Sequence, residues 1–246
     1  MSTLLWIIAA TTANSLVALA GVVTLALSQK TFDKILHGLV GFSAGALLAG
    51  AFFHLIAESL DEIPVMEAFY ILFAGFILFF LIEKFLHWHH CHEGKCDVHA
   101  VSYLILIGDG IHNFIDGLII AASFLVSMPV GVATSIAVIS HELPQELGDF
   151  GVLVYSGFGK KKALAYNLLS QATSIIGGII GFFLVGETGF AVYLLPFAAG
   201  GFIYISASDL IPELHKQKNL KKSMVSFMFF LLGIAFMIGI KLILKG

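Results

Sequence analysis

The sequence predicts an all-α, polytopic membrane protein with eight transmembrane helices and both termini on the extracytoplasmic side. First, 59% of the 246 residues are hydrophobic and only 12% are charged, about half the ~25% typical of a soluble domain. Second, the mean hydropathy is +0.97, and a soluble core of this length could not bury so much apolar surface. Third, the lysines follow a one-sided pattern between the apolar stretches. A secreted disulfide scaffold, a disordered chain and a nucleic-acid-binding protein are excluded, the last because the net charge is −3.

A transmembrane helix needs about 20 largely apolar residues, and eight stretches satisfy this requirement. They lie at about 3–28, 35–60, 65–87, 99–126, 129–157, 160–186, 189–213 and 219–245. Because they occupy most of the chain, we expect a single transmembrane domain over residues 1–246. A polar, His-rich loop at 87–99 joins the third span to the fourth.

The lysines indicate the orientation, because loops that carry Lys and Arg tend to stay in the cytoplasm. The chain has no Arg, and its 13 basic residues are all Lys. Only Lys241 and Lys245 lie on the side that carries Asp61, Glu62 and Glu187; the other lysines all fall at connections on the opposite side. Eight spans therefore place both termini outside, in a plasma or inner membrane, whereas seven or nine spans would scatter the lysines over both faces.

Polar residues interrupt the fourth and fifth spans, where ionisable side chains are costly and indicate a functional site by default. The fourth span carries Asp109, His112, Asn113 and Asp116, and the fifth carries His141, Glu142, Gln145, Glu146 and Asp149. Residues four apart share a helix face, so both spans present polar ladders. A single polar residue could simply bond a neighbouring helix, but two clusters at mid-depth predict a site between the two spans.

The residue types of this site predict a divalent transition metal. Imidazole suits zinc, iron, copper and nickel, while carboxylate alone suits magnesium, calcium and manganese. The mixed set makes Zn(II) the first choice, with iron and manganese behind it, and the lack of a thiol predicts moderate affinity. Ser170 and Gln171 of the sixth span are further candidates to face this site.

Pro144 lies inside the fifth-span ladder. It removes one backbone hydrogen bond and clashes with the carbonyl group of Ser140, which predicts a kink. A freed carbonyl is tolerated at membrane depth only where protein or a polar cavity receives it. We therefore expect the kink to lie beside the metal.

Two segments resemble paired signatures of the ZIP family of divalent metal transporters (Zrt/Irt-like proteins). They are residues 112–117, HNFIDG, and residues 141–149, HELPQELGD. The second is similar to the HExPHExGD signature of one large ZIP subfamily. The resemblance covers essentially the whole chain, including eight spans and a His-rich cytoplasmic loop.

The resemblance implies a binuclear metal centre between spans four and five. One site would use His112, Asp116, His141 and Gln145. The neighbouring site would use Asn113 and Glu142, share Asp116 and Gln145 with the first, and have Glu146 as a further ligand or hydrogen-bond partner. The resemblance also implies uptake into the cytoplasm, movement of spans 1, 4, 5 and 6 against spans 2, 3, 7 and 8, and often a homodimer.

Gln145 departs from the subfamily signature, which has a second His at this position. A Gln carbonyl is a weak, neutral, hard ligand, so we expect a looser zinc site with a preference shifted toward harder ions. The same departure weighs against a zinc protease, because His-Glu-x-x-His is the protease motif and its second His is missing here.

Other side chains could line the path of the ion. The candidates for access or exit are His54, Glu58, Asp109, Asp149, Asp209 and Glu213. His54 and Glu58 share a helix face at the outer end of span two, where they could form with Asp61 and Glu62 an acidic mouth that concentrates cations; ordinary interfacial polar residues are the alternative. The 87–99 loop has soft ligands typical of metal binding: His87, His89, His90, Cys91, His92, Cys96 and His99.

The sequence thus predicts a non-enzymatic transporter that moves a divalent transition metal, zinc first, into the cytoplasm through spans four and five. An intramembrane metal-dependent hydrolase, with a metal-activated water at the same cluster, remains an alternative. A metal sensor that uses the His-rich loop is another.

Overall fold

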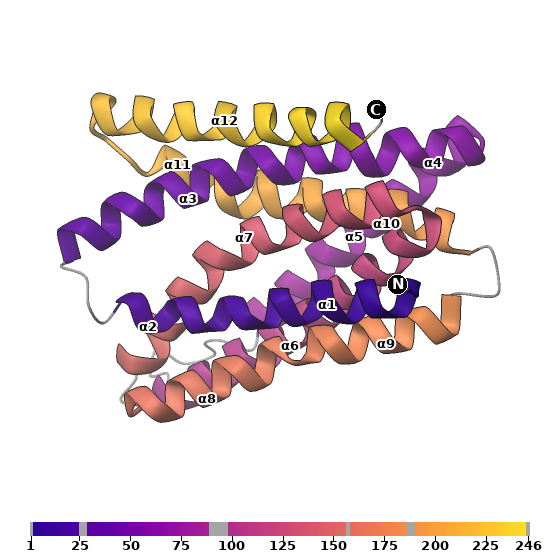
Figure 1. Cartoon of the computed structure of the whole chain (residues 1–246). Helices are drawn as coiled ribbons and strands as arrows, with labels where there is room; N and C mark the ends of the chain where they lie inside the picture. The colour runs from indigo at the N-terminus through magenta and orange to yellow at the C-terminus, as the bar shows by residue number, and fades with distance from the viewer. Residues whose placement is uncertain (1, 25–28, 89–97, 156–157, 186–189, 245–246) are drawn as a thin grey trace.

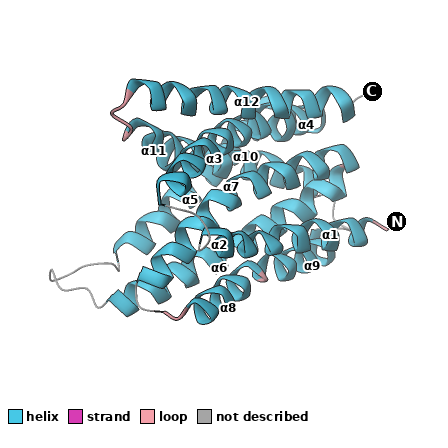
Figure 2. Ribbon diagram, turned by 60° about the vertical axis from the view of Figure 1, so that its left-hand side comes forward, coloured by secondary structure: helices cyan, strands magenta, loops and turns pink. Residues whose placement is uncertain are grey.

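The computed structural model describes residues 2–24, 29–88, 98–155, 158–185 and 190–244, and every regular element among them is a helix. Figure 2 shows these helices, with only short loops of described residues between them. The all-α prediction is therefore confirmed. Long helices run side by side, and the start of α1 and the end of α12 lie at the same end of the bundle (Figure 1).

The α-helices of the described residues have the following bounds. They are α1 (Thr3–Ser15), α2 (Ala20–Thr24), α3 (Gln29–Ala49), α4 (Ala57–Glu62), α5 (Val65–Trp88), α6 (Val98–Val126), α7 (Met128–Tyr155), α8 (Lys160–Gln171), α9 (Thr173–Val185), α10 (Ala191–Ile205), α11 (Ile211–His215) and α12 (Leu220–Leu244).

Four of the predicted spans are not one uniform α-helix. A 3₁₀ turn at Leu16–Leu19 joins α1 to α2, and π-helical turns at Gly50–Ile56 and Ser206–Leu210 join α3 to α4 and α10 to α11. Span six is divided at Ala172, between α8 and α9. π-Helical turns are rare and frequently mark functional sites.

Seven stretches of described residues are long and apolar enough to cross a membrane, which establishes a multi-pass membrane protein. They are Thr3–Val22, Ile35–Ser59, Val65–Lys84, Leu106–Val126, Lys160–Val185, Ala191–His215 and Leu220–Ile243. Helix α7 is not among them. With 28 residues it is about 42 Å long, enough for a hydrocarbon core of about 30 Å, but its polar ladder lowers its hydropathy.

Glycines let three helix pairs approach closely. A Cβ atom at Gly117 of α6 would lie 2.0 Å from the carbonyl oxygen of Ser174 of α9. A Cβ atom at Gly233 of α12 would lie 2.1 Å from the carbonyl oxygen of Phe42 of α3. A Cβ at Gly200 would lie 2.0 Å from the carbonyl oxygen of Leu72, which joins α10 to α5. Small residues at helix interfaces permit this backbone contact in membranes.

These pairs build two helix groups. Helices α1, α6, α8 and α9 pack on one another, while α3 packs on α12 and α5 packs on α10. Figure 1 shows α3 and α12 at the top of the bundle and α6, α8 and α9 at the bottom. Helix α7 lies between the groups and contacts both α6 and α3, so its polar ladder is enclosed by protein.

Candidate metal centre

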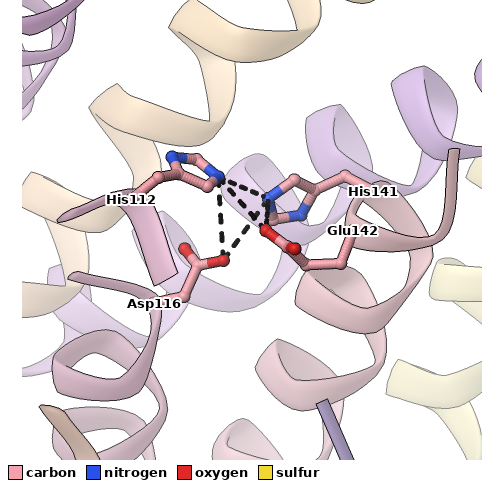
Figure 3. A group of neighbouring side chains, drawn as sticks. All are labelled: His112, Asp116, His141 and Glu142. Carbon is pink, nitrogen blue, oxygen red and sulfur yellow. Dashed lines mark hydrogen bonds and ion pairs between the residues drawn. The ribbon is translucent and has the colours of Figure 1, made fainter. Parts of the chain in front are cut away.

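Four side chains from α6 and α7 converge on one point (Figure 3). They are His112, Asp116, His141 and Glu142, and one ligand atom of each lies within 4.8 Å of those of the others. All except His112 are buried, and the His112 side chain is 17% exposed. The i, i+4 spacing of His112 and Asp116 presents both on one face of α6, as the sequence predicts.

The distances between these atoms fit a single small cation. The Nε2 atom of His112 lies 3.1 Å from that of His141 and 3.3 Å from Oε1 of Glu142. The Nε2 atom of His141 lies 3.4 Å from the same Glu142 oxygen and 3.4 Å from Oδ2 of Asp116; the His112–Asp116 distance is 3.8 Å. Four tetrahedral ligands bonded to Zn²⁺ at about 2.0–2.1 Å lie about 3.3–3.4 Å apart. The side chains are therefore spaced close to the geometry of a tetrahedral zinc ion.

Hydrogen bonds leave the correct atoms free for a cation. The Nδ1 atom of His141 lies 3.3 Å from the carbonyl oxygen of Ala137, an acceptor only, so Nδ1 carries the proton and Nε2 keeps its lone pair. Both carboxylate oxygens of Asp116 and Oε1 of Glu142 have no hydrogen-bond partner among the described residues. Buried carboxylate oxygens that accept no hydrogen bond are costly, and a bound cation would satisfy them.

A second carboxylate group adjoins the first on its predicted cytoplasmic side. Asp109, Glu142 and Glu146 each offer an oxygen within 4.8 Å of the others, and all three are buried. Glu142 belongs to both groups, so the two clusters are continuous. An oxygen-only set of this kind favours harder ions than the histidine cluster does.

Asn113 and Gln145 point their amide nitrogens at Asp109. The Nδ2 atom of Asn113 donates to Oδ1 of Asp109 at 2.9 Å, and the Nε2 atom of Gln145 donates to the same oxygen at 3.1 Å. The ligand set implied by the family resemblance placed Gln145 beside the two histidines and Glu142 in the neighbouring site. In the structure Glu142 takes the place beside the histidines, and Gln145 supports Asp109.

Helix α8 supplies neutral donors to the same carboxylates. Ser170 donates to Oδ2 of Asp109 at 2.5 Å, and Gln171 donates to Oε1 of Glu146 at 2.7 Å and also to Glu142. Asn167 donates to Glu146 as well. Ser170 and Gln171 were candidates from the sequence, but Asn167 was not. The sequence could have indicated Asn167, because this polar residue precedes Ser170 by three positions and Gln171 by four. All three therefore lie on one helix face.

Two aromatic rings close the histidine pair from the other helix group. The ring of Phe79 on α5 lies edge-on to His112 with centroids 6.2 Å apart, and that of Phe202 on α10 lies 6.0 Å from His141. Both phenylalanines are buried. Nothing distinguishes them in the sequence from the other 21 Phe residues, so their place beside the site comes from the tertiary structure alone.

The carbonyl group of Ser140, one helical turn before Pro144, accepts a hydrogen bond from another helix. Pro144 lacks an N–H group, so the carbonyl of Ser140 loses its helical partner, and the hydroxyl group of Ser43 on α3 donates to this carbonyl. Helix α7 continues through the proline. The freed backbone is thus received by protein one residue from His141; the kink itself stays a prediction.

Of the residues proposed for ion access and exit, only Asp109 belongs to the two clusters formed by the described residues. His54 is buried in the π-helical turn, and its Nε2 donates to the carbonyl oxygen of Met237 at 2.9 Å, so His54 is not part of an open acidic mouth. Glu58 is half-buried, and Asp61 and Glu62 are exposed; a mouth formed by these three stays a prediction. Asp209 is exposed, Glu213 is exposed and pairs with Lys216 at 2.6 Å, and Asp149 is half-buried.

The His-rich loop lies mostly outside the described residues. His89, His90, Cys91, His92 and Cys96 fall in 89–97, and the side chains of His87 and His99, at the ends of α5 and α6, are also outside the described part. Metal binding by this loop stays a prediction from the sequence.

Comparison with known proteins gives consistent matches. A family model described as ZIP Zinc transporter matches residues 89–241. The chain is 41% identical over 145 residues to "Zinc transporter foi" of Drosophila melanogaster, which covers 59% of this chain and 20% of that protein. It is 41% identical over 150 residues to "Zinc transporter ZIP10" of Homo sapiens, covering 54% and 18%. It is 29% identical over 324 residues to "Metal cation symporter ZIP14" of Bos taurus, covering 95% and 66%. The chain thus spans about a fifth of the length of the first two relatives.

Proposed function

The chain belongs to the ZIP family of zinc transporters, and we propose that it carries a divalent transition metal, zinc first, into the cytoplasm. The ion would bind between α6 and α7 to His112, Asp116, His141 and Glu142. The relatives named as zinc transporters and a metal cation symporter support this substrate class.

One observation carries the proposal. Two imidazole nitrogens and two carboxylate oxygens meet at mid-helix with separations of 3.1–3.8 Å, while the acidic oxygens lack hydrogen-bond partners among the described residues. The two Nε2 atoms contact each other and the carboxylates, so all four ligand atoms face one another rather than donors from outside the group. Four acceptor atoms of both ligand types around one point favour a cation.

The second carboxylate group supports a binuclear centre or a following step on the same route. Asp109, Glu142 and Glu146 lie within 4.8 Å of one another, and Asp109 and Glu146 lie on the cytoplasmic side of the histidines in the lysine-based orientation. An ion that leaves the imidazoles would meet this oxygen-only set next. Because the shared Glu142 contacts both groups, the ion need not lose all its protein ligands between them.

The orientation rests on eight spans, with α7 as the fifth. Only with α7 in the membrane do the lysine-bearing connections fall on one face, which we take as cytoplasmic, with both termini outside in a plasma or inner membrane. Polar ladders in α7 are tolerable there because α3, α6 and α8 enclose them.

Movement of one helix group past the other would expose the centre to alternate sides. The glycine-mediated contacts join helices within the groups, as in α6 with α9 and α3 with α12. The phenylalanines that close the histidine pair, Phe79 and Phe202, come from the opposite group. A sliding group would therefore carry the ligands as a unit and leave the two rings behind.

Metal binding displaces protons, because imidazole and carboxylate ligands must be deprotonated. Uptake should therefore weaken as the medium is acidified, whether or not protons are the coupled ion. A homodimer, which the family resemblance implies, would add no ligand to a centre that lies wholly within α6 and α7.

Uptake of radioactive zinc into proteoliposomes tests this function. We expect saturable uptake by the purified chain, loss of uptake in His112→Ala, and normal uptake in His215→Ala, which changes an exposed histidine of α11. Fe(II), Mn(II) and Cd(II) serve as competitors. Absence of uptake despite stoichiometric zinc binding would contradict transport and favour the sensor or hydrolase, which differ in whether metal-dependent turnover of a peptide or lipid is found.

A further inference from the structure

Gln171, on α8, contacts two glutamates of the metal centre, Glu142 and Glu146. It is the last residue of α8, it is fully buried, and its Nε2 donates to Oε2 of Glu142 and, at 2.7 Å, to Oε1 of Glu146. One amide group therefore holds one oxygen of each glutamate. No charged donor contacts either of these two oxygens among the described residues.

This contact decides which Glu142 oxygen faces the histidines. With Oε2 held by Gln171, Oε1 lies 3.3 Å from Nε2 of His112 and 3.4 Å from that of His141, and it has no hydrogen-bond partner in the described chain. We propose that Gln171 is a positioning residue for the metal ligand Glu142. The proposal rests on the proposed function, since it assigns a role within the same metal centre.

The backbone of α8 and α9 holds Gln171 in place. The hydroxyl group of Ser15 on α1 donates to the carbonyl oxygen of Gln171 at 2.8 Å, and Thr173 donates to that of Ser170 at 2.7 Å. Both carbonyls belong to the last turn of α8, where helical donors are lacking. These two hydrogen bonds hold the last turn of α8 in place. The Gln171 amide is therefore kept against α7.

A neutral donor suits this position better than a charged one. Lys or Arg would also bond Glu142, but their charge would repel the incoming cation and neutralise the carboxylate that must bind it. An amide orients the oxygen and leaves the negative charge available. Gln171→Lys should therefore abolish metal binding, whereas Gln171→Leu should only weaken it.

Binding of Zn²⁺ and Co²⁺ to the purified, metal-depleted full chain tests the proposal. We expect Gln171→Leu to weaken zinc binding by about 10–100-fold, the usual effect of losing a partner of a metal ligand, and to change the absorption spectrum of bound Co²⁺. Asn14→Leu is the matched control: Asn14 is equally buried and bonds Ser174 at 3.4 Å, but it donates to no carboxylate of the centre in the described contacts. Should Gln171→Leu fail to fold, Gln171→Asn keeps the amide but shortens its reach, and the same loss is expected.

A double-mutant cycle separates positioning from general support of the fold. If Gln171 acts through Glu142, Gln171→Leu should change Co²⁺ affinity less than about twofold in a Glu142→Gln background, where the ligand is already impaired. Equal losses in both backgrounds, or an unchanged affinity and spectrum in Gln171→Leu alone, would overturn the proposal. Failure of the unmodified chain to bind zinc would instead contradict the proposed function.

Discussion

The Nε2 atoms of His112 and His141 lie 3.1 Å apart, although 29 residues separate the two histidines in the chain. The proton of His141 is on Nδ1, which donates to Ala137, so its Nε2 presents a lone pair to its neighbour. Two imidazoles in this arrangement can share one proton or bind one metal ion. Oδ2 of Asp116 and Oε1 of Glu142 lie beside them without a hydrogen-bond partner among the described residues, which favours the metal.

X-ray absorption spectroscopy of the chain loaded with one equivalent of zinc should detect two imidazole nitrogens and two oxygens. The reason is that the four ligand atoms surround one point, as a tetrahedral site requires. His112→Ala should reduce the imidazole count to one. A sulfur neighbour would contradict this assignment, because it would place the zinc in the loop that carries Cys91 and Cys96.

Gln145→His should tighten zinc binding and reduce competition by Mn²⁺. Imidazole is a better zinc ligand than an amide, and Gln145 lies one turn from His141 on α7. The change also removes the hydrogen bond from Gln145 to Asp109, so the oxygen-only group loses a support. Competition by Mn²⁺ and Fe²⁺ against zinc binding measures the effect. If the Gln145→His variant kept the order of metal preference of the unmodified chain, position 145 would not set selectivity. Gln217→His, on a half-exposed residue after α11, controls for an added histidine.

Helical spacing was enough to predict the histidine cluster but not its details. His112, Asp116 and His141 follow from the 3.6-residue period, which determines the face of a helix. It does not determine rotamers, so neither the turn of the Gln145 amide toward Asp109 nor the reach of Glu142 to the histidines was predictable. The burial of His54 was not predictable for a different reason. A π-helical turn at Gly50–Ile56 shifts the register, and His54 bonds the backbone of α12.

Gly117→Ala should destabilise the protein and reduce uptake. The added methyl group would lie 2.0 Å from the carbonyl oxygen of Ser174, so α6 and α9 must separate, at a cost of about 1–3 kcal/mol. Gly239→Ala is the matched control, because nothing lies within 4 Å of its Cβ position on α12 and alanine favours a helix by up to about 1 kcal/mol. Thermal unfolding in detergent compares the two. Equal melting temperatures would show that α6 and α9 separate at little cost in stability.

Asp116→Asn should stabilise the metal-free protein and abolish its stabilisation by zinc. Asp116 is fully buried and neither of its oxygens has a hydrogen-bond partner among the described residues, so the ionised carboxylate is costly until a cation arrives. The amide carries no charge, which removes that cost and also a zinc ligand. In the unmodified chain, zinc at 100 times its Kd should add about 2.7 kcal/mol to the free energy of unfolding. Melting temperatures with zinc and with a chelator measure both effects, and Asn219→Asp, an exposed change outside the cluster, should leave the zinc-dependent rise intact. A metal-free variant that melts below the unmodified chain would mean that Asp116 is satisfied without a cation, and would remove one of the four ligands from the proposed site.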